Sequence, residues 1–180
     1  MRHITVLLKP TEECNLRCAY CYHADTGYVK GKMSIDFFEE IIHKIVESYN
    51  KITLIFHGGE PLLMGYDFYK RAFSIINKYK QNGIQWILGI QTNGYFLDEC
   101  FCKLFESNNI IPSISFDGPG TMNILRDQTT RITENIVKLR KKGHPINLLG
   151  VITKKNMDLI EDYYFFAKEN GCPLKLNPVF

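Results

Sequence analysis

The sequence predicts an α/β fold in which parallel strands alternate with helices. The apolar residues switch repeatedly between a period of two, typical of strands, and a period of about 3.6, typical of helices. Strict strand–helix alternation favours parallel strands joined by right-handed crossovers. Six expected strands and five expected helices fit either an open doubly wound sheet or a partial (β/α)6 barrel that ends after the sixth strand.

Each expected element has its own local signal. The strands are short β-rich runs at Ile4–Leu8, Ile52–Phe56, Trp86–Ile90, Ile110–Phe116, Ile146–Ile152 and Leu174–Phe180. The clearest helix follows Ser34, an expected N-cap, because apolar residues from Phe38 to Tyr49 fall on one face. Further helices are expected at Tyr66–Lys80, Leu97–Ser107, Arg131–Lys142 and Met157–Asn170. Glycine just past a helix predicts the stops at Gly83, Gly143 and Gly171.

Length and composition indicate one domain over residues 1–180. The chain has 180 residues, 45% of them hydrophobic, which is enough to form one sizeable core. The net charge of +3 comes from scattered charges and indicates no nucleic-acid partner. No apolar run reaches the roughly 20 residues of a membrane helix, and no signal peptide is recognisable, so we expect a cytoplasmic protein without a membrane partner.

Unusual residues follow four of the predicted strands. These loops are residues 14–21, 57–61, 91–94 and 115–119. Because parallel strands end at the same rim, and sites are built there in both architectures, the four loops predict one functional site.

Half of the six cysteines lie in the stretch CNLRCAYC, residues 14–21. In a chain that is not secreted, clustered thiols are more typical of metal ligands than of disulfides. Cys100 and Cys102 point about 200° apart on their predicted helix and cannot chelate one metal together. We expect Cys100 on the apolar stripe, Cys102 on the polar side, and no metal-binding role for either or for Cys172.

Three thiolates without a fourth suit an iron–sulfur cube, because one iron then has no protein ligand and can bind a small molecule. A zinc site or a disulfide with this spacing is the alternative. Structural zinc normally takes four ligands, which three cysteines alone do not supply. The cysteine spacing alone leaves both interpretations open.

CNLRCAYC, with the aromatic Tyr20 before its last cysteine, resembles the cluster motif of the radical S-adenosylmethionine (radical SAM) superfamily. Three further stretches resemble the superfamily in order: HGGEP at 57–61, QTNG at 91–94, and SFDGP at 115–119, followed by Arg126. INLLGVITKKN at 146–156 also resembles its fifth strand. The last two are similar to one branch, the peptide and protein maturases, which includes the anaerobic sulfatase-maturating enzymes. The resemblance runs from Val6 to Phe180 and favours the partial barrel.

The resemblance implies a ligand set for two cofactors. A 4Fe-4S cluster would be held by Cys14, Cys18 and Cys21. S-adenosylmethionine (SAM) would chelate the open iron, and its ammonium would donate hydrogen bonds to Gly58, Gly59 and Glu60.

The rest of SAM would meet the other loops. Its carboxylate would be held by Ser115 and Arg126, with Arg131 and Arg140 as alternatives to the arginine. The ribose or the substrate would contact Gln91 and Asn93, and the adenine would lie near Tyr20. Asp117 is expected only to turn its loop, and no role is assigned to His57.

The implied activity is reductive cleavage of SAM to a deoxyadenosyl radical, which abstracts hydrogen from a peptide or protein side chain. An electron donor such as flavodoxin or ferredoxin is an expected partner. The C-terminal extension with auxiliary clusters found in fuller family members is absent from residues 1–180. The alternatives are a radical SAM activase or small-molecule enzyme, and a non-catalytic metal-binding or electron-transfer module.

Overall fold

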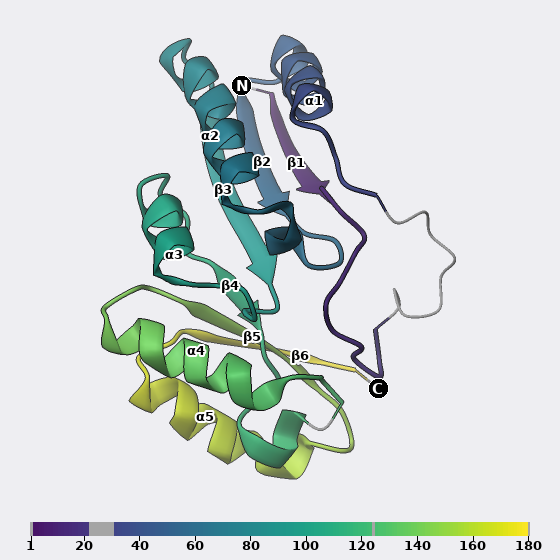
Figure 1. Ribbon diagram of the computed structural model, residues 1–180, viewed down its shortest axis with the longest axis vertical. Coiled ribbons are helices and arrows are strands. Elements are labelled where there is room, and N and C mark those ends of the chain that lie inside the picture. Colours follow the sequence, from purple (N-terminus) through teal and green to yellow (C-terminus); the bar gives the residue numbers. More distant parts are fainter. Residues whose placement is uncertain (1, 22–30, 124, 180) are drawn as a thin grey trace.

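Six parallel strands form one sheet in the computed structural model, which describes residues 2–21, 31–123 and 125–179. The strands are β1 (His3–Leu8), β2 (Lys51–Phe56), β3 (Gln85–Thr92), β4 (Ser113–Ser115), β5 (Asn147–Ile152) and β6 (Leu174–Pro178). Each strand pairs with the next one in the sequence, so the order is β1-β2-β3-β4-β5-β6. A doubly wound sheet would reverse its strand order. The partial-barrel prediction is confirmed, and the sheet curls into a half-barrel (Figure 1).

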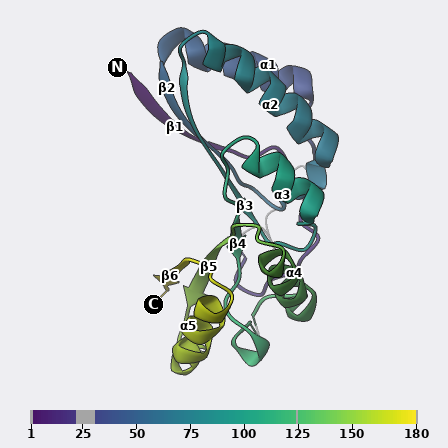
Figure 2. The same ribbon diagram turned by 90° about the vertical axis from the view of Figure 1, so that its left-hand side faces the viewer.

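The helices follow the strands as the apolar pattern predicted. They are α1 (Ile35–Ser48), α2 (Tyr66–Gln81), α3 (Glu99–Glu106), α4 (Thr129–Lys141) and α5 (Ile160–Glu169), with short 3-10 turns at η1 (Pro61–Met64), η2 (Gly120–Asn123) and η3 (Met157–Leu159). Ser34 caps α1, because its hydroxyl accepts a hydrogen bond from the backbone N–H of Phe37 at 3.1 Å. Figure 2 shows α1, α2, α3 and α4 along one side of the curved sheet.

One helix is placed differently from the prediction. The Asp98 carboxylate accepts the backbone N–H of Phe101 at 2.9 Å and starts α3 at Glu99. The face of α3 that packs inward carries Phe101, Cys102 and Phe105, so Cys102 is 1% exposed and Cys100 is exposed. The expectation that Cys100 lies in the core and Cys102 on the polar side was therefore wrong.

The core lies between the sheet and its helices. In β2, Ile52, Leu54 and Phe56 are fully buried, whereas the residues between them are partly exposed. Phe56 packs edge-on against Tyr69 of α2, which also contacts the aromatic residues of α3. One face of the sheet is thus covered by helices, and the other lines the inside of the half-barrel. In the described part of the chain, no helix is both long and apolar enough to cross a membrane.

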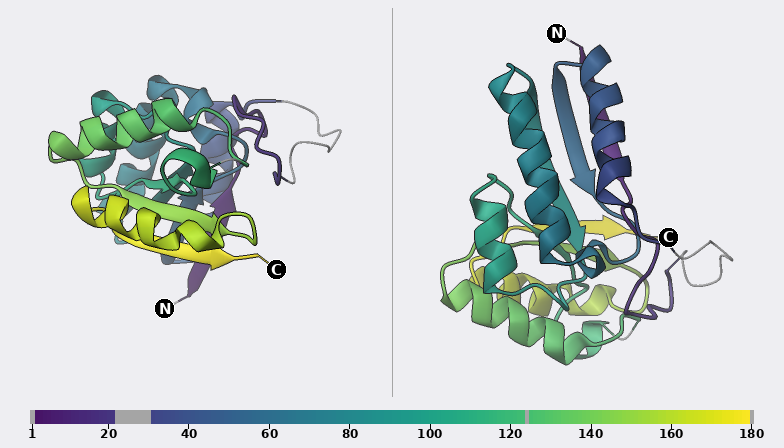
Figure 3. Two further views of the ribbon diagram at one scale, coloured as in Figure 1. Left: turned by 90° about the horizontal axis from the view of Figure 1, so that it is seen from below. Right: turned by 45° about the horizontal axis from the view of Figure 1, so that its top comes forward.

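The segment after β1 leaves the sheet at the end where the parallel strands terminate (Figure 1 and Figure 3). Its base is closed where Thr11 forms an antiparallel bridge with Lys32 and donates its hydroxyl to the Gly31 carbonyl at 2.9 Å. The start of the cysteine loop is therefore held by this bridge and this hydrogen bond.

Candidate functional site

One cavity of about 370 Å³ at the carboxyl rim brings the four predicted loops together. Its size falls within the range of small-molecule sites. Ten of the eleven residues predicted for the site line it, namely Cys14, Cys18, Tyr20, Cys21, Gly58, Gly59, Gln91, Asn93, Ser115 and Arg126. Residues from β5, β6 and the positions just after them also line the cavity, namely Leu149, Val151, Thr153, Asn177 and Val179. The sequence analysis predicted none of these five for the site.

The two glycines of the second loop let the cysteine segment approach its backbone. Gly59 donates its N–H to the Thr11 carbonyl at 3.1 Å, and Glu60 donates its N–H to the Glu13 carbonyl at 2.7 Å. A Cβ on Gly59 would lie 2.2 Å from the Glu13 carbonyl oxygen, too close for any side chain. These glycines therefore fix the position of the chain that leads into Cys14.

The Glu60 side chain is the one predicted site group that lies outside the cavity lining. It is fully buried, and its carboxylate accepts hydrogen bonds from Thr92 Oγ1 at 2.7 Å, Asn93 N at 2.7 Å and Leu62 N at 2.9 Å. Burial raises the pKa of this carboxyl, and the hydrogen bonds from Asn93 and Thr92 oppose the rise. The carboxylate thus joins the second loop to the third, and the expected contact of Glu60 with the SAM ammonium stays a prediction.

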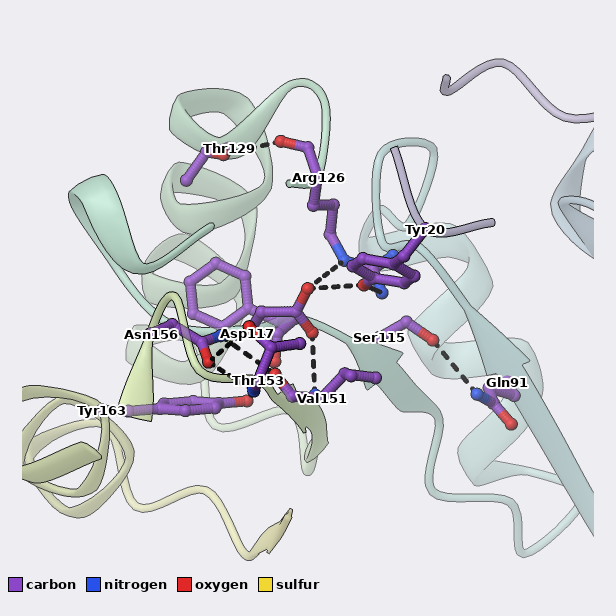
Figure 4. Close-up of polar contacts among 11 residues, drawn as sticks. Tyr20, Gln91, Ser115, Asp117, Arg126, Thr129, Val151, Thr153, Asn156 and Tyr163 are labelled. Carbon is purple, nitrogen blue, oxygen red and sulfur yellow. Dashed lines mark hydrogen bonds and ion pairs between the residues drawn. The ribbon is translucent and has the colours of Figure 1, made fainter. Parts of the chain in front are cut away.

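Asp117 is the centre of a polar network that crosses the cavity wall (Figure 4). Its Oδ2 accepts the Tyr20 hydroxyl at 2.5 Å and lies 3.4 Å from Arg126 Nε, while Oδ1 accepts the Val151 N–H at 2.9 Å. Arg126 Nη2 also donates to the Tyr20 hydroxyl at 2.5 Å. Gly118 has φ 121°, as the Asp-Gly turn predicted. In addition to forming that turn, Asp117 orients the cavity residues Tyr20 and Arg126. The sequence did not indicate this role of Asp117.

Arg126 is the one cavity-lining residue among the three arginines considered for an anionic ligand. Its side chain is 9% exposed, and its Nη1 is not used in the contacts to Asp117 and Tyr20. Arg131 instead lies over the Tyr95 ring, with 4.3 Å from Cζ to the ring centroid. The Arg140 guanidinium donates to three backbone carbonyls near the end of α5 and the start of β5. A buried guanidinium with a donor nitrogen outside its contacts to Asp117 and Tyr20 suits a carboxylate.

Two further predicted residues meet each other across the rim. Gln91 Nε2 donates to Ser115 Oγ at 3.2 Å, so the ends of β3 and β4 present an amide and a hydroxyl side by side. Such groups both donate and accept, and they can bind hydroxyl or carboxylate groups.

The chemistry of the three cavity thiols fits an iron–sulfur cluster. All three are free thiols, and burial raises the pKa values of Cys14 and Cys18, although the nearby Arg126 charge lowers that of Cys18. The loop is tied to the far wall because Ala19 donates its N–H to the Leu125 carbonyl at 2.8 Å. Among the described residues, no three His, Cys, Asp or Glu side chains are placed to hold a single metal ion. A cluster takes one thiolate per iron and does not require the thiols to meet at one point.

The sequence profile of the radical SAM superfamily matches residues 8–167. The chain belongs to the radical SAM superfamily. It is 32% identical, over 99% of its length and 52% of the relative's, to a cysteine-type anaerobic sulfatase-maturating enzyme of Clostridium novyi. It is 31% identical, over 93% of its length and 44% of the relative's, to the serine-type enzyme of Bacteroides thetaiotaomicron.

Solved structures share the fold of this radical SAM chain. The structure of anSMEcpe with bound AdoMet superposes with a TM-score of 0.88 at 24% identity, over 99% of this chain and 52% of that one. Streptococcus suis SuiB bound to S-adenosylmethionine superposes with a TM-score of 0.73 at 16% identity, over 98% of this chain and 40% of that one. The chain spans about half the length of these curated relatives.

Proposed function

We propose that this chain is the catalytic core of a radical SAM enzyme that modifies a peptide or protein side chain. Cys14, Cys18 and Cys21 hold a 4Fe-4S cluster, and SAM occupies the adjoining cavity. When bound and reduced, the cluster supplies the electron that cleaves SAM to methionine and a deoxyadenosyl radical, which abstracts a hydrogen atom from the substrate. The observation that carries this proposal is that three free thiols share one cavity with Arg126 and the paired Gln91 and Ser115.

The cavity walls supply the groups that a zwitterionic ligand needs. Arg126 and Ser115 bind the carboxylate of SAM, and the backbone carbonyls of the Gly58–Gly59 loop accept hydrogen bonds from its ammonium. Tyr20 closes the cavity beside the adenine. These residues orient SAM and exclude water, which matters because a carbon radical reacts with any nearby C–H bond unless the protein positions one.

Peptides bound in related structures support a peptide substrate. One anSMEcpe structure contains AdoMet and the Cp18Cys peptide, and one SuiB structure contains the precursor peptide SuiA. The inner face of the half-barrel offers a partly exposed apolar surface at Leu7, Ile55 and Ile87. A flavodoxin or ferredoxin would deliver the electron.

Anaerobic reconstitution tests this function. The protein is rebuilt with iron and sulfide, reduced with dithionite and mixed with SAM, and deoxyadenosine is measured by mass spectrometry. We expect deoxyadenosine from the unaltered chain and none from Cys18→Ala, whereas Cys100→Ala, which removes an exposed thiol on α3, keeps both the cluster and the product. A protein that binds stoichiometric zinc and stays colourless after reconstitution would contradict the proposal.

A further inference from the structure

Asn93, at the end of β3, is held entirely by protein groups although it lines the cavity. The residue is 7% exposed, and its Oδ1 accepts the Tyr95 N–H at 2.9 Å. Its Nδ2 donates to Asn15 Oδ1 at 2.9 Å and lies 3.8 Å from Cys14 Sγ. An amide nitrogen has two hydrogens, so these two contacts use both. The amide therefore has no donor left for a ribose hydroxyl or a substrate.

The position of Asn93 is fixed from behind by Glu60. The buried carboxylate accepts the Asn93 N–H at 2.7 Å through Oε2 and the Thr92 hydroxyl at 2.7 Å through Oε1. Hydrogen bonds to a charged acceptor in a buried setting are stronger than those between neutral groups. The Asn93 amide is thus pre-oriented toward Cys14, as the supporting residues around metal ligands commonly are.

Cys14 receives two N–H donors in this arrangement. The first is the backbone N–H of Leu16 at 3.4 Å from Sγ, and the second is Asn93 Nδ2. Hydrogen bonds to cluster sulfurs are one of the terms that set the reduction potential of an iron–sulfur centre. A donor at the sulfur stabilises the reduced state more than the oxidised state, because the reduced cluster carries one more negative charge.

We propose that Asn93 is a positioning residue that raises the reduction potential of the cluster bound through Cys14. The proposal rests on the proposed function, because it requires the cluster on the three cysteines. It replaces the expected contact of Asn93 with the ribose or substrate. Its consequence is that the third rim loop tunes electron transfer to the cluster, in addition to forming a wall of the cavity.

A redox titration of the reconstituted full chain, followed by electron paramagnetic resonance without SAM, tests the proposal. We expect Asn93→Ala to keep its iron and sulfide and to shift the midpoint potential to a more negative value. The expected shift is about 59 mV, which is a tenfold change in the equilibrium of a one-electron reduction. Asn15→Ala is the matched control, since it removes the other acceptor of the same amide and leaves the contact with the sulfur in place. Its potential should equal that of the unaltered protein.

Equal potentials for Asn93→Ala and the unaltered protein, at equal iron content, would overturn the proposal. If Asn93→Ala loses iron, the titration is made on Asn93→Ser, whose side chain is too short to reach the sulfur. Loss of iron from both variants would also overturn it, because Asn93 would then serve assembly and not potential. Absence of iron and sulfide from the unaltered protein would refute the proposed function itself.

Discussion

Replacing Asp117 by Asn should destabilise the chain markedly, although the two side chains have nearly the same shape. Asp117 and Arg126 form an ion pair with side-chain exposures of 2% and 9%. In Asp117→Asn the buried guanidinium loses its counter-charge, and the new amide presents N–H groups either to Tyr20 and Arg126 or to the Val151 N–H, all of which are donors. Removing one partner of a buried pair typically costs about 3–5 kcal/mol.

That cost translates into a large thermal shift. For a chain of 150–250 residues, 1 kcal/mol changes Tm by about 2–4 °C, so the loss should be roughly 6–20 °C. The assay is thermal unfolding of the cluster-free protein under anaerobic conditions, followed by circular dichroism. Glu99→Gln is the control, since it removes a carboxylate that pairs with Lys103 and Lys142 at the surface, where ion pairs contribute little.

A double variant separates the effect of the unpaired buried charge from the effect of altered side-chain packing. Asp117→Asn combined with Arg126→Met removes both charges and should recover part of the lost Tm, because the two changes are coupled. The reasoning would be refuted if Asp117→Asn lowered Tm no more than Glu99→Gln does. It would also be refuted if the two single changes added fully in the double variant.

Two further variants test other contacts around the site. Gly59→Ala should lower stability by about 1–3 kcal/mol or more, because the new Cβ would lie 2.2 Å from a backbone carbonyl of the cysteine segment. Gly31→Ala, where a Cβ meets nothing within 4 Å, should leave the urea unfolding midpoint unchanged, and equal midpoints for both variants would contradict the close approach. Tyr163→Phe should cost about 1–3 kcal/mol in the same assay, because its buried hydroxyl donates to a backbone carbonyl just after β4. A midpoint equal to that of Gly31→Ala would show that this hydrogen bond contributes nothing measurable.

Most of the fold could be predicted from local patterns. Helix α2 begins at Tyr66 and β6 at Leu174, both as the apolar periodicity indicated, because period and capping are properties of neighbouring residues. The cysteine-bearing helix α3 shows where such reasoning fails. The face of α3 that packs inward carries Phe101, Cys102 and Phe105, and this packing decided which thiol is buried.

The sequence by itself determined the elements, the rim loops and the residue types that meet there. Tertiary structure decided how those residues are used: Glu60 holds Asn93, 33 positions away, and Asp117 holds Tyr20, 97 positions away. The donors that bind a buried carboxylate depend on how loops from different strands approach each other in space. The periodicity of the sequence carries no information on the distance between those loops. The same long-range packing placed Asn93 against Cys14 and joined the four loops into one site.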